Sequence, residues 1–192
     1  MREMIAPRTL SPDAFTEILE RYRWPLYIFL RNLVAEDENA RDLVQDVFCD
    51  AWRAALKARP PFLRDGADDE VRRWLFHTAY CRAASMLRRR RLVRWESLDA
   101  DSFNSTWPAV AVTSIEDQVI EAEVVRVALN TLTPDDAACL LLSIVHAFTV
   151  AEIAQVIGIS FEAAKKRLTR AKQRLRAAYF AQNPSVQERT GR

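Results

Sequence analysis

Glycine is scarce in this chain, with three among 192 residues, while 49% of the residues are hydrophobic. Sheet-rich folds need glycine at tight turns and bulges, so this composition predicts an all-α protein. No apolar run approaches the roughly 18 residues of a membrane span. The first residues, MREMIAPRTLSPDAF, also lack the apolar core of a signal peptide. We therefore expect a cytoplasmic protein without membrane insertion.

Cysteine and histidine are rare as well. Cys49, Cys81 and Cys139 are odd in number and far apart, which excludes a disulfide framework, and no CxxC or His/Cys spacing suits zinc. We interpret them as small core residues. His77 and His146 belong to no Ser/His/Asp or Cys/His set, and there is no glycine-rich phosphate loop. The sequence thus predicts no enzyme activity, no cofactor and no metal.

The net charge of +2 conceals an uneven distribution along the chain. Residues 1–58 carry −2 and residues 96–147 carry −8, whereas residues 59–95 and residues 148–192 each carry +6. Two basic segments separated by an acidic one indicate two points of contact with a polyanion. Two solvated basic helix faces would give the same pattern, so both interpretations stand at this point.

Hydrophobic periodicity divides the chain into two helical domains. The pattern of residues 1–91 predicts three helices that share a core. The first begins at Ser11 and is kinked or broken at Pro25, the second covers 39–57 and the third covers 69–91. The periodicity fails over 92–113, which predicts a flexible linker with a span of about 25 Å. Helices resume at Ser114 and end near residue 180. Residues 181–192 read as a disordered tail.

The second domain contains a helix-turn-helix pattern. Thr149 and Glu152 form a capping box for a short helix, Gly158 supplies the turn, and Ser160 caps a long final helix. One face of the final helix is apolar, and it carries Phe161, Ala164, Leu168, Ala171, Leu175 and Ala178. The opposite face and its flanks carry the candidate major-groove contacts Glu162, Lys165, Lys166, Arg167, Thr169, Arg170 and Gln173. A helical hairpin with a solvated basic face is the alternative.

The third helix of the first domain is rich in arginine. Arginines interleaved with aromatic residues suit contacts to phosphates and unpaired bases. The candidate nucleic-acid contacts are Arg72, Arg73, His77, Arg88, Arg89 and Arg90. We place Trp74 of this helix in the core.

The second helix of the first domain has an acidic outer face. Asp42, Gln45, Asp46 and Asp50 share that face, while Val47 and its neighbours form a buried stripe. Such a face could bind a basic protein surface, although the residues alone favour plain solvent exposure.

Taken in order, these motifs resemble the extracytoplasmic-function sigma factors, the two-domain bacterial initiation factors of RNA polymerase. The segment DLVQDVF at residues 42–48, followed by Ala51 and Trp52, is similar to the family's polymerase-binding helix. Trp74-Leu75 with its basic helix end is similar to the reader of the minus-ten promoter element. The pattern from Leu132 through Gly158 to Leu175 is similar to region 4. Three stretches depart from the family: residues 78–81 read TAYC, residues 162–167 read EAAKKR, and the start of region 4 at residues 135–139, DDAAC, is unusually apolar and acidic.

The resemblance implies a division of labour along the chain. Residues 1–91 would form a region 2-like domain that binds core RNA polymerase through Asp42, Gln45, Asp46, Phe48 and Trp52. Its arginine-rich helix would engage the minus-ten element. Residues 114–180 would read the minus-thirty-five element of promoter DNA. An anti-sigma factor is a further partner that the resemblance allows.

Two other functions remain compatible with the residues. A stand-alone helix-turn-helix regulator, with residues 1–95 as a sensor or dimerisation domain, would bind DNA tightly without polymerase. A helical adaptor that binds only protein would show no salt-dependent affinity for DNA.

Overall fold

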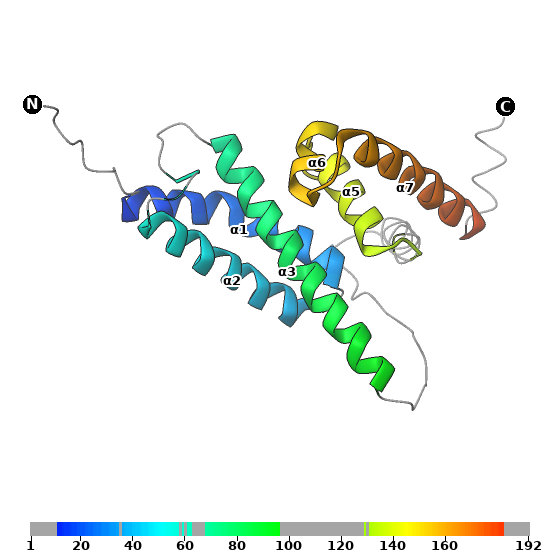
Figure 1. The fold of residues 1–192 in the computed structure, drawn as a ribbon, viewed down its shortest axis with the longest axis horizontal. Helices are drawn as coiled ribbons and strands as arrows, with labels where there is room; N and C mark the ends of the chain where they lie inside the picture. Colours follow the sequence, from blue (N-terminus) through cyan, green and yellow to red (C-terminus); the bar gives the residue numbers. More distant parts are fainter. Residues whose placement is uncertain are drawn as a thin grey trace, which may run out of the picture.

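The computed structural model describes residues 11–34, 36–57, 59, 61–62, 68–96, 129 and 131–182, except for the side chains of 91–96. This part of the chain contains six helices and no strand (Figure 1). The prediction of an all-α protein is confirmed. None of the described helices combines the length and hydropathy needed to cross a membrane.

Three long helices form the N-terminal half. They are α1 (Pro12–Val34), α2 (Asp37–Leu56) and α3 (Asp68–Glu96), and each packs against the other two (Figure 1). The shared core that the sequence predicts is present. Its fully or almost fully buried side chains include Leu26, Phe29, Leu30, Val47, Ala51, Leu75, Phe76 and Ala79. Trp74 lies at the edge of this core, with its ring 5.2 Å from that of Phe62.

Helix α1 runs through Pro25 without a break, so of the predicted kink or break the break is wrong. A proline inside a helix costs about 3 kcal/mol, because it removes a hydrogen bond and crowds the preceding turn. Burial of Leu26, Phe29 and Leu30 directly after Pro25 offsets this cost, since each buried side chain of this kind contributes about 1.5–3 kcal/mol. Packing against α2 and α3 therefore overrides the local preference.

Helix α3 extends to Glu96, five residues into the segment expected to be a linker. The start of the linker at residue 92 is therefore wrong. Residues 97–113, the helix expected from Ser114 as far as residue 128, and residues 183–192 of the expected tail lie outside the described part of the chain.

The C-terminal half contains α5 (Pro134–Ile144), α6 (Val150–Ile157) and α7 (Phe161–Gln182). The predicted capping box is present, because the Thr149 side chain accepts from the Glu152 backbone N–H while the Glu152 carboxylate accepts from that of Thr149. Gly158 has φ +77°, the left-handed conformation that ends α6 and that glycine adopts without steric cost. These local contacts confirm the predicted helix-turn-helix.

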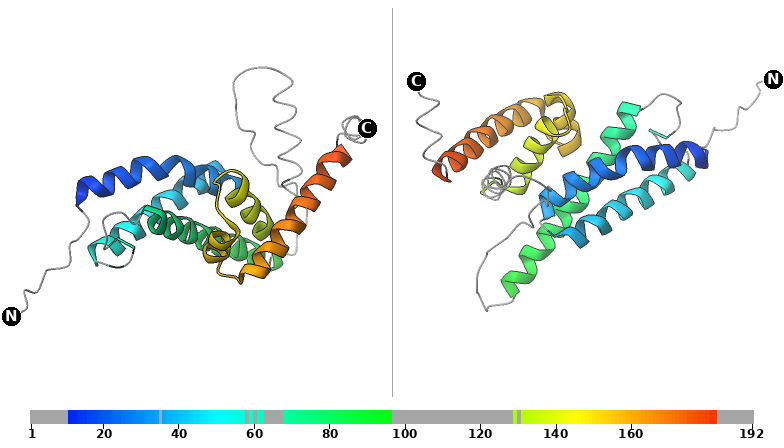
Figure 2. Two further views of the ribbon diagram at one scale, coloured as in Figure 1. Left: turned by 90° about the horizontal axis from the view of Figure 1, so that it is seen from above. Right: turned by 180° about the vertical axis from the view of Figure 1, so that it is seen from behind.

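The two halves are packed against each other, which no sequence pattern predicted. Helix α3 contacts α6, and α1 contacts α5 (Figures 1 and 2). Phe76 of α3 lies at the centre of the contact, with its ring 5.3 Å from Phe29, 4.7 Å from His146 and 5.1 Å from Phe148. The buried side chains of both halves therefore form one continuous cluster.

Candidate nucleic-acid and protein interfaces

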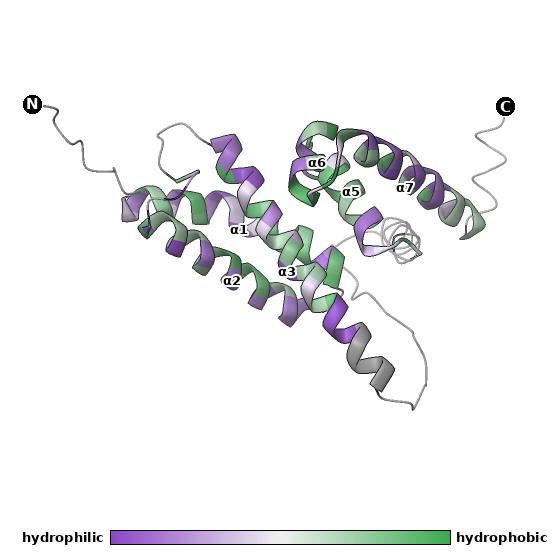
Figure 3. Ribbon diagram, in the orientation of Figure 1, coloured by the Kyte–Doolittle hydropathy of each residue, from purple (hydrophilic) through white to green (hydrophobic). Residues whose placement is uncertain are grey.

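The outer face of α7 is polar and open to solvent, as predicted. Its apolar face buries Ala164, Leu168 and Ala171, and hydrophilic residues follow the other side of the helix (Figure 3). The exposed candidates for a major-groove contact are Glu162, Lys165, Lys166, Thr169, Arg170 and Gln173. The prediction for Phe161 is wrong, because the helical wheel assigned this residue to the inner face and 48% of it is exposed.

Arg167 differs from the other candidates on α7. It is only half exposed, and its guanidinium forms an ion pair with the Asp135 carboxylate at the start of α5. Asp135 also accepts a hydrogen bond of 2.8 Å from the Tyr80 hydroxyl of α3. One carboxylate therefore joins α3, α5 and α7.

The six candidates on α3 fall into two groups. Arg72, Arg73 and His77 each contact a group of the helix-turn-helix half, although His77 keeps an exposed surface. The Arg72 guanidinium donates to the His146 carbonyl oxygen and lies 3.9 Å from the centre of the Phe148 ring. Arg73 pairs with Glu152 at 3.5 Å, and His77 Nδ1 lies 2.8 Å from the Val156 carbonyl oxygen.

The second group lies at the far end of α3. Arg88 and Arg89 are exposed, and within the described residues the hydrogen bonds of Arg88 go to Ala84 and Ser85 of its own helix. Arg90 instead makes two bonds of 2.9 Å to the Glu36 carboxylate, before α2. This pairing lowers the pKa of Glu36. Arg88 and Arg89 are therefore the two candidates on α3 that are open to a ligand.

The acidic face of α2 is partly neutralised by α3. Arg82 Nη1 donates to Asp46 at 2.6 Å, and Arg82 Nε donates to Asp50 at 2.9 Å. Asp42 and Gln45 are exposed and have no such partner in the described part of the chain. The sequence offered no signal for Arg82, because the pairing depends on how α2 and α3 cross.

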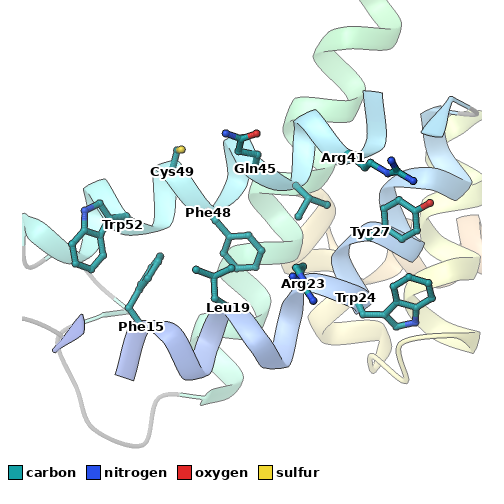
Figure 4. Close-up of a pocket in the computed structure, with 11 residues that line it drawn as sticks. Phe15, Leu19, Arg23, Trp24, Tyr27, Arg41, Gln45, Phe48, Cys49 and Trp52 are labelled. Carbon is teal, nitrogen blue, oxygen red and sulfur yellow. The ribbon is translucent and has the colours of Figure 1, made fainter. Parts of the chain in front are cut away.

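Beside this face, α1 and α2 border an open apolar groove of about 870 Å³ (Figure 4). Phe48 is buried in its floor, and Trp52 packs edge-on to Phe15 with ring centres 4.9 Å apart. Gln45 lines the same groove. The remaining lining residues are Leu19, Arg23, Trp24, Tyr27, Arg41, Val44 and Cys49. Gln45, Phe48 and Trp52, predicted as protein contacts, are thus brought together, whereas Asp42 and Asp46 lie outside the lining.

The cysteines only partly match their interpretation as core residues. Cys139 is fully buried, and burial raises the pKa of its thiol to about 12. Cys49 and Cys81 are exposed, so the interpretation is wrong for them. The described residues contain no cluster of histidine, cysteine and carboxylate groups suited to a metal ion.

His146 is buried between the two halves, with 9% of its surface exposed. Burial, aided by the charge of Arg72, lowers its pKa to about 4. The unfolded chain therefore binds a proton below pH 6.5 that the folded chain does not bind until about pH 4. Stability is fully present above pH 6.5 and falls as the pH drops toward 4, by about 3 kcal/mol in total.

We expect urea unfolding to show this loss between pH 7 and pH 5, and His146→Phe to flatten the dependence in that range. The matched variant is His77→Gln, which removes the other histidine of the chain. An unchanged slope in His146→Phe would contradict the assignment.

The protein family described as "Sigma-70, region 4" matches residues 122–175. No curated protein sequence matches the chain significantly. Among solved structures, the fold is similar to the sigma factor RpoE from Bartonella quintana, solved in complex with the anti-sigma factor NepR. The TM-score is 0.65 at 23% identity, over 85% of this chain and 95% of that one. It is also similar to CnrH, solved in complex with the cytosolic domain of CnrY, with a TM-score of 0.61 at 22% identity over 89% and 90% of the two chains.

Proposed function

We infer that the chain is an extracytoplasmic-function sigma factor, a subunit that directs RNA polymerase to promoters and takes part in opening the DNA. The match of residues 122–175 to sigma-70 region 4 carries this inference. The similarity of the fold to the sigma factor RpoE and to CnrH supports it, and the motif order found in the sequence agrees with it. Sigma factors are not enzymes, and we assign the reaction chemistry to the polymerase, in the cytoplasm, with no cofactor held by this chain.

The N-terminal half supplies the polymerase contact in this proposal. We assign residues 1–96 to a region 2-like domain in which Asp42, Gln45 and Asp46 contact a basic surface of core polymerase. Phe48 and Trp52 shape the apolar groove beside that face rather than project from it. An acidic face next to an apolar groove suits a protein partner, because it combines charge complementarity with area to bury.

The DNA contacts are divided between the halves. Arg88 and Arg89 are placed to engage the minus-ten element, because they are exposed at the end of α3. We assign residues 97–113 to the linker, because α3 continues to Glu96, and 114–180 to a region 4-like domain whose helix α7 reads the minus-thirty-five element. Both similar structures were solved in complex with a second protein, which in the case of RpoE is the anti-sigma factor NepR. We therefore propose an anti-sigma factor as a further partner of this chain.

Reconstitution with core RNA polymerase tests this function. The chain should co-elute with core polymerase, and the complex should start transcripts at a defined set of promoters that core polymerase alone does not use. Specific, tight binding of duplex DNA by the free chain, with no effect on polymerase, would instead support a stand-alone regulator.

The exposed face of α7 makes a separate prediction about promoter choice. Glu162 lies in the first turn of α7, where residues of a recognition helix reach base edges, and Lys166 follows one turn later. Glu162→Ala and Lys166→Ala should each change preference at particular base pairs by about 1–3 kcal/mol. Arg170→Ala should instead weaken all sequences alike, because a phosphate contact carries no sequence information.

Selection of promoter variants with each mutant holoenzyme separates these cases. A minus-thirty-five preference left unchanged by both Glu162→Ala and Lys166→Ala would mean that α7 contacts only the DNA backbone or reads DNA shape.

A further inference from the structure

Helix α2 carries three aspartates one turn apart on its outer face. Asp42, Asp46 and Asp50 follow each other at four-residue spacing, so their side chains are neighbours along the helix. Like charges at this spacing repel each other and destabilise a helix. A cation beside the row relieves the repulsion, and α3, which packs against α2, supplies one (Figure 1).

That cation is Arg82, whose guanidinium bridges two of the three aspartates. Its Nε donates to Asp50 Oδ2 at 2.9 Å, and its Nη2 donates to the same oxygen. Its Nη1 donates to Asp46 Oδ2 at 2.6 Å. Only 30% of the Arg82 side chain is exposed, so packing and three charge-assisted hydrogen bonds hold the guanidinium in one place.

The bridge leaves the two carboxylates in different states. Both oxygens of Asp50 are bonded, because Arg53 donates to Oδ1 at 3.1 Å and Arg82 donates to Oδ2. Asp46 gives Oδ2 to Arg82, while its Oδ1 accepts no hydrogen bond from the described residues and its side chain is 57% exposed. Asp46 is therefore fixed through one oxygen, and the other oxygen is left for a partner.

We propose that Arg82 is a positioning residue for polymerase binding, which holds Asp46 in the rotamer that the basic surface of core polymerase recognises. This inference rests on the proposed function, which assigns Asp46 to that interface. A mobile side chain loses rotational freedom when it binds a partner, whereas a side chain that is already held loses little. Asp50 anchors Arg82 and does not itself contact the polymerase, because both of its oxygens are occupied.

The substitution Arg82→Lys tests this role in the full chain. It keeps the charge beside α2, but the single nitrogen of lysine cannot reproduce the planar fork that joins Asp46 to Asp50. We expect the affinity for core polymerase to fall by about fivefold, measured by fluorescence anisotropy of the labelled chain. An effect of net charge alone predicts no change, since arginine and lysine both carry +1.

The matched control is Arg53→Lys, which changes the other arginine on Asp50. Its side chain is 68% exposed and makes no contact with Asp46 in the described residues. This variant should bind core polymerase with wild-type affinity.

A double-mutant cycle with Asp46→Asn separates positioning from a general structural role. Asp46→Asn removes the charge that the polymerase recognises, so it weakens binding by itself. Because Arg82 acts through Asp46, Arg82→Lys should have no further effect in the Asp46→Asn background. A merely structural defect would instead lower the thermal unfolding midpoint and weaken binding by the same factor in both backgrounds.

Wild-type polymerase affinity of the Arg82→Lys variant would overturn the proposal, and so would an equal loss in the two backgrounds. In either case the wild-type chain still binds core polymerase, and the proposed function stands. A wild-type chain that fails to bind core polymerase would contradict the proposed function, and the role of Arg82 with it.

Discussion

Reversing the charge of Asp42 or Asp46 is expected to abolish assembly with core RNA polymerase. Both residues lie on the exposed acidic face of α2. An arginine there would meet a basic partner surface with like charge, which costs several kcal/mol at an interface. We therefore expect Asp42→Arg and Asp46→Arg each to lower the affinity for core polymerase by at least about a hundredfold, measured by co-elution and fluorescence anisotropy.

The two substitutions differ in a way that serves as an internal control. Asp46 pairs with Arg82, so Asp46→Arg also breaks a contact within the protein, whereas Asp42 has no ion-pair partner in the described residues. Arg82→Ala measures the effect of losing that contact alone. Glu17→Arg places the same charge reversal on an exposed position of α1 and should assemble normally. Normal assembly of a folded Asp42→Arg variant would remove the acidic face from the interface.

Replacing both Arg88 and Arg89 by alanine is expected to cause a large defect in promoter opening. These arginines are exposed at the end of α3, so their loss leaves the core untouched. Arginines there can neutralise phosphates and stack on unpaired bases, and each stacked base is worth about 1–3 kcal/mol. We expect open complexes to form about ten- to a hundredfold less well, as followed by permanganate reactivity of unpaired thymines, with polymerase binding unchanged.

The matched control removes two other exposed arginines of the same half. Arg21→Ala/Arg53→Ala changes the net charge equally, at side chains that are 60% and 68% exposed. It should form open complexes at close to the wild-type level. Wild-type permanganate reactivity in Arg88→Ala/Arg89→Ala would mean that these arginines are only solvated charges.

The local parts of this fold could be predicted from the sequence. The capping box at Thr149 and Glu152, the left-handed turn at Gly158 and the cap at Ser160 all act within a few residues of the helix end that they define. The amphipathic stripes of α2 and α7 were predicted for the same reason, because helical periodicity places their apolar residues on one face. The exposed candidates on α7 and the acidic face of α2 follow from these stripes.

The errors fall where packing competes with local preference. Pro25 disfavours a helix locally, yet the buried residues that follow it hold α1 together. Polar residues past Arg91 suggested a linker, yet α3 continues to Glu96. Cys49 and Cys81 resemble core residues by type, but their exposure depends on which side of the helix meets a neighbour.

The contact between the two halves depends on residues far apart in the chain. Arg72 and His146 are 74 positions apart, and Tyr80 and Asp135 are 55 apart. A capping residue bonds to a group only a few positions away in the chain, so the local sequence is enough to predict that hydrogen bond. An arginine on one helix can pair with any acid that the fold brings near. The sequence therefore established the helices, the helix-turn-helix and the charged faces. Which arginines stay exposed was decided only by packing, because α7 against α5 pairs Arg167 with Asp135 and α3 against α6 pairs Arg73 with Glu152.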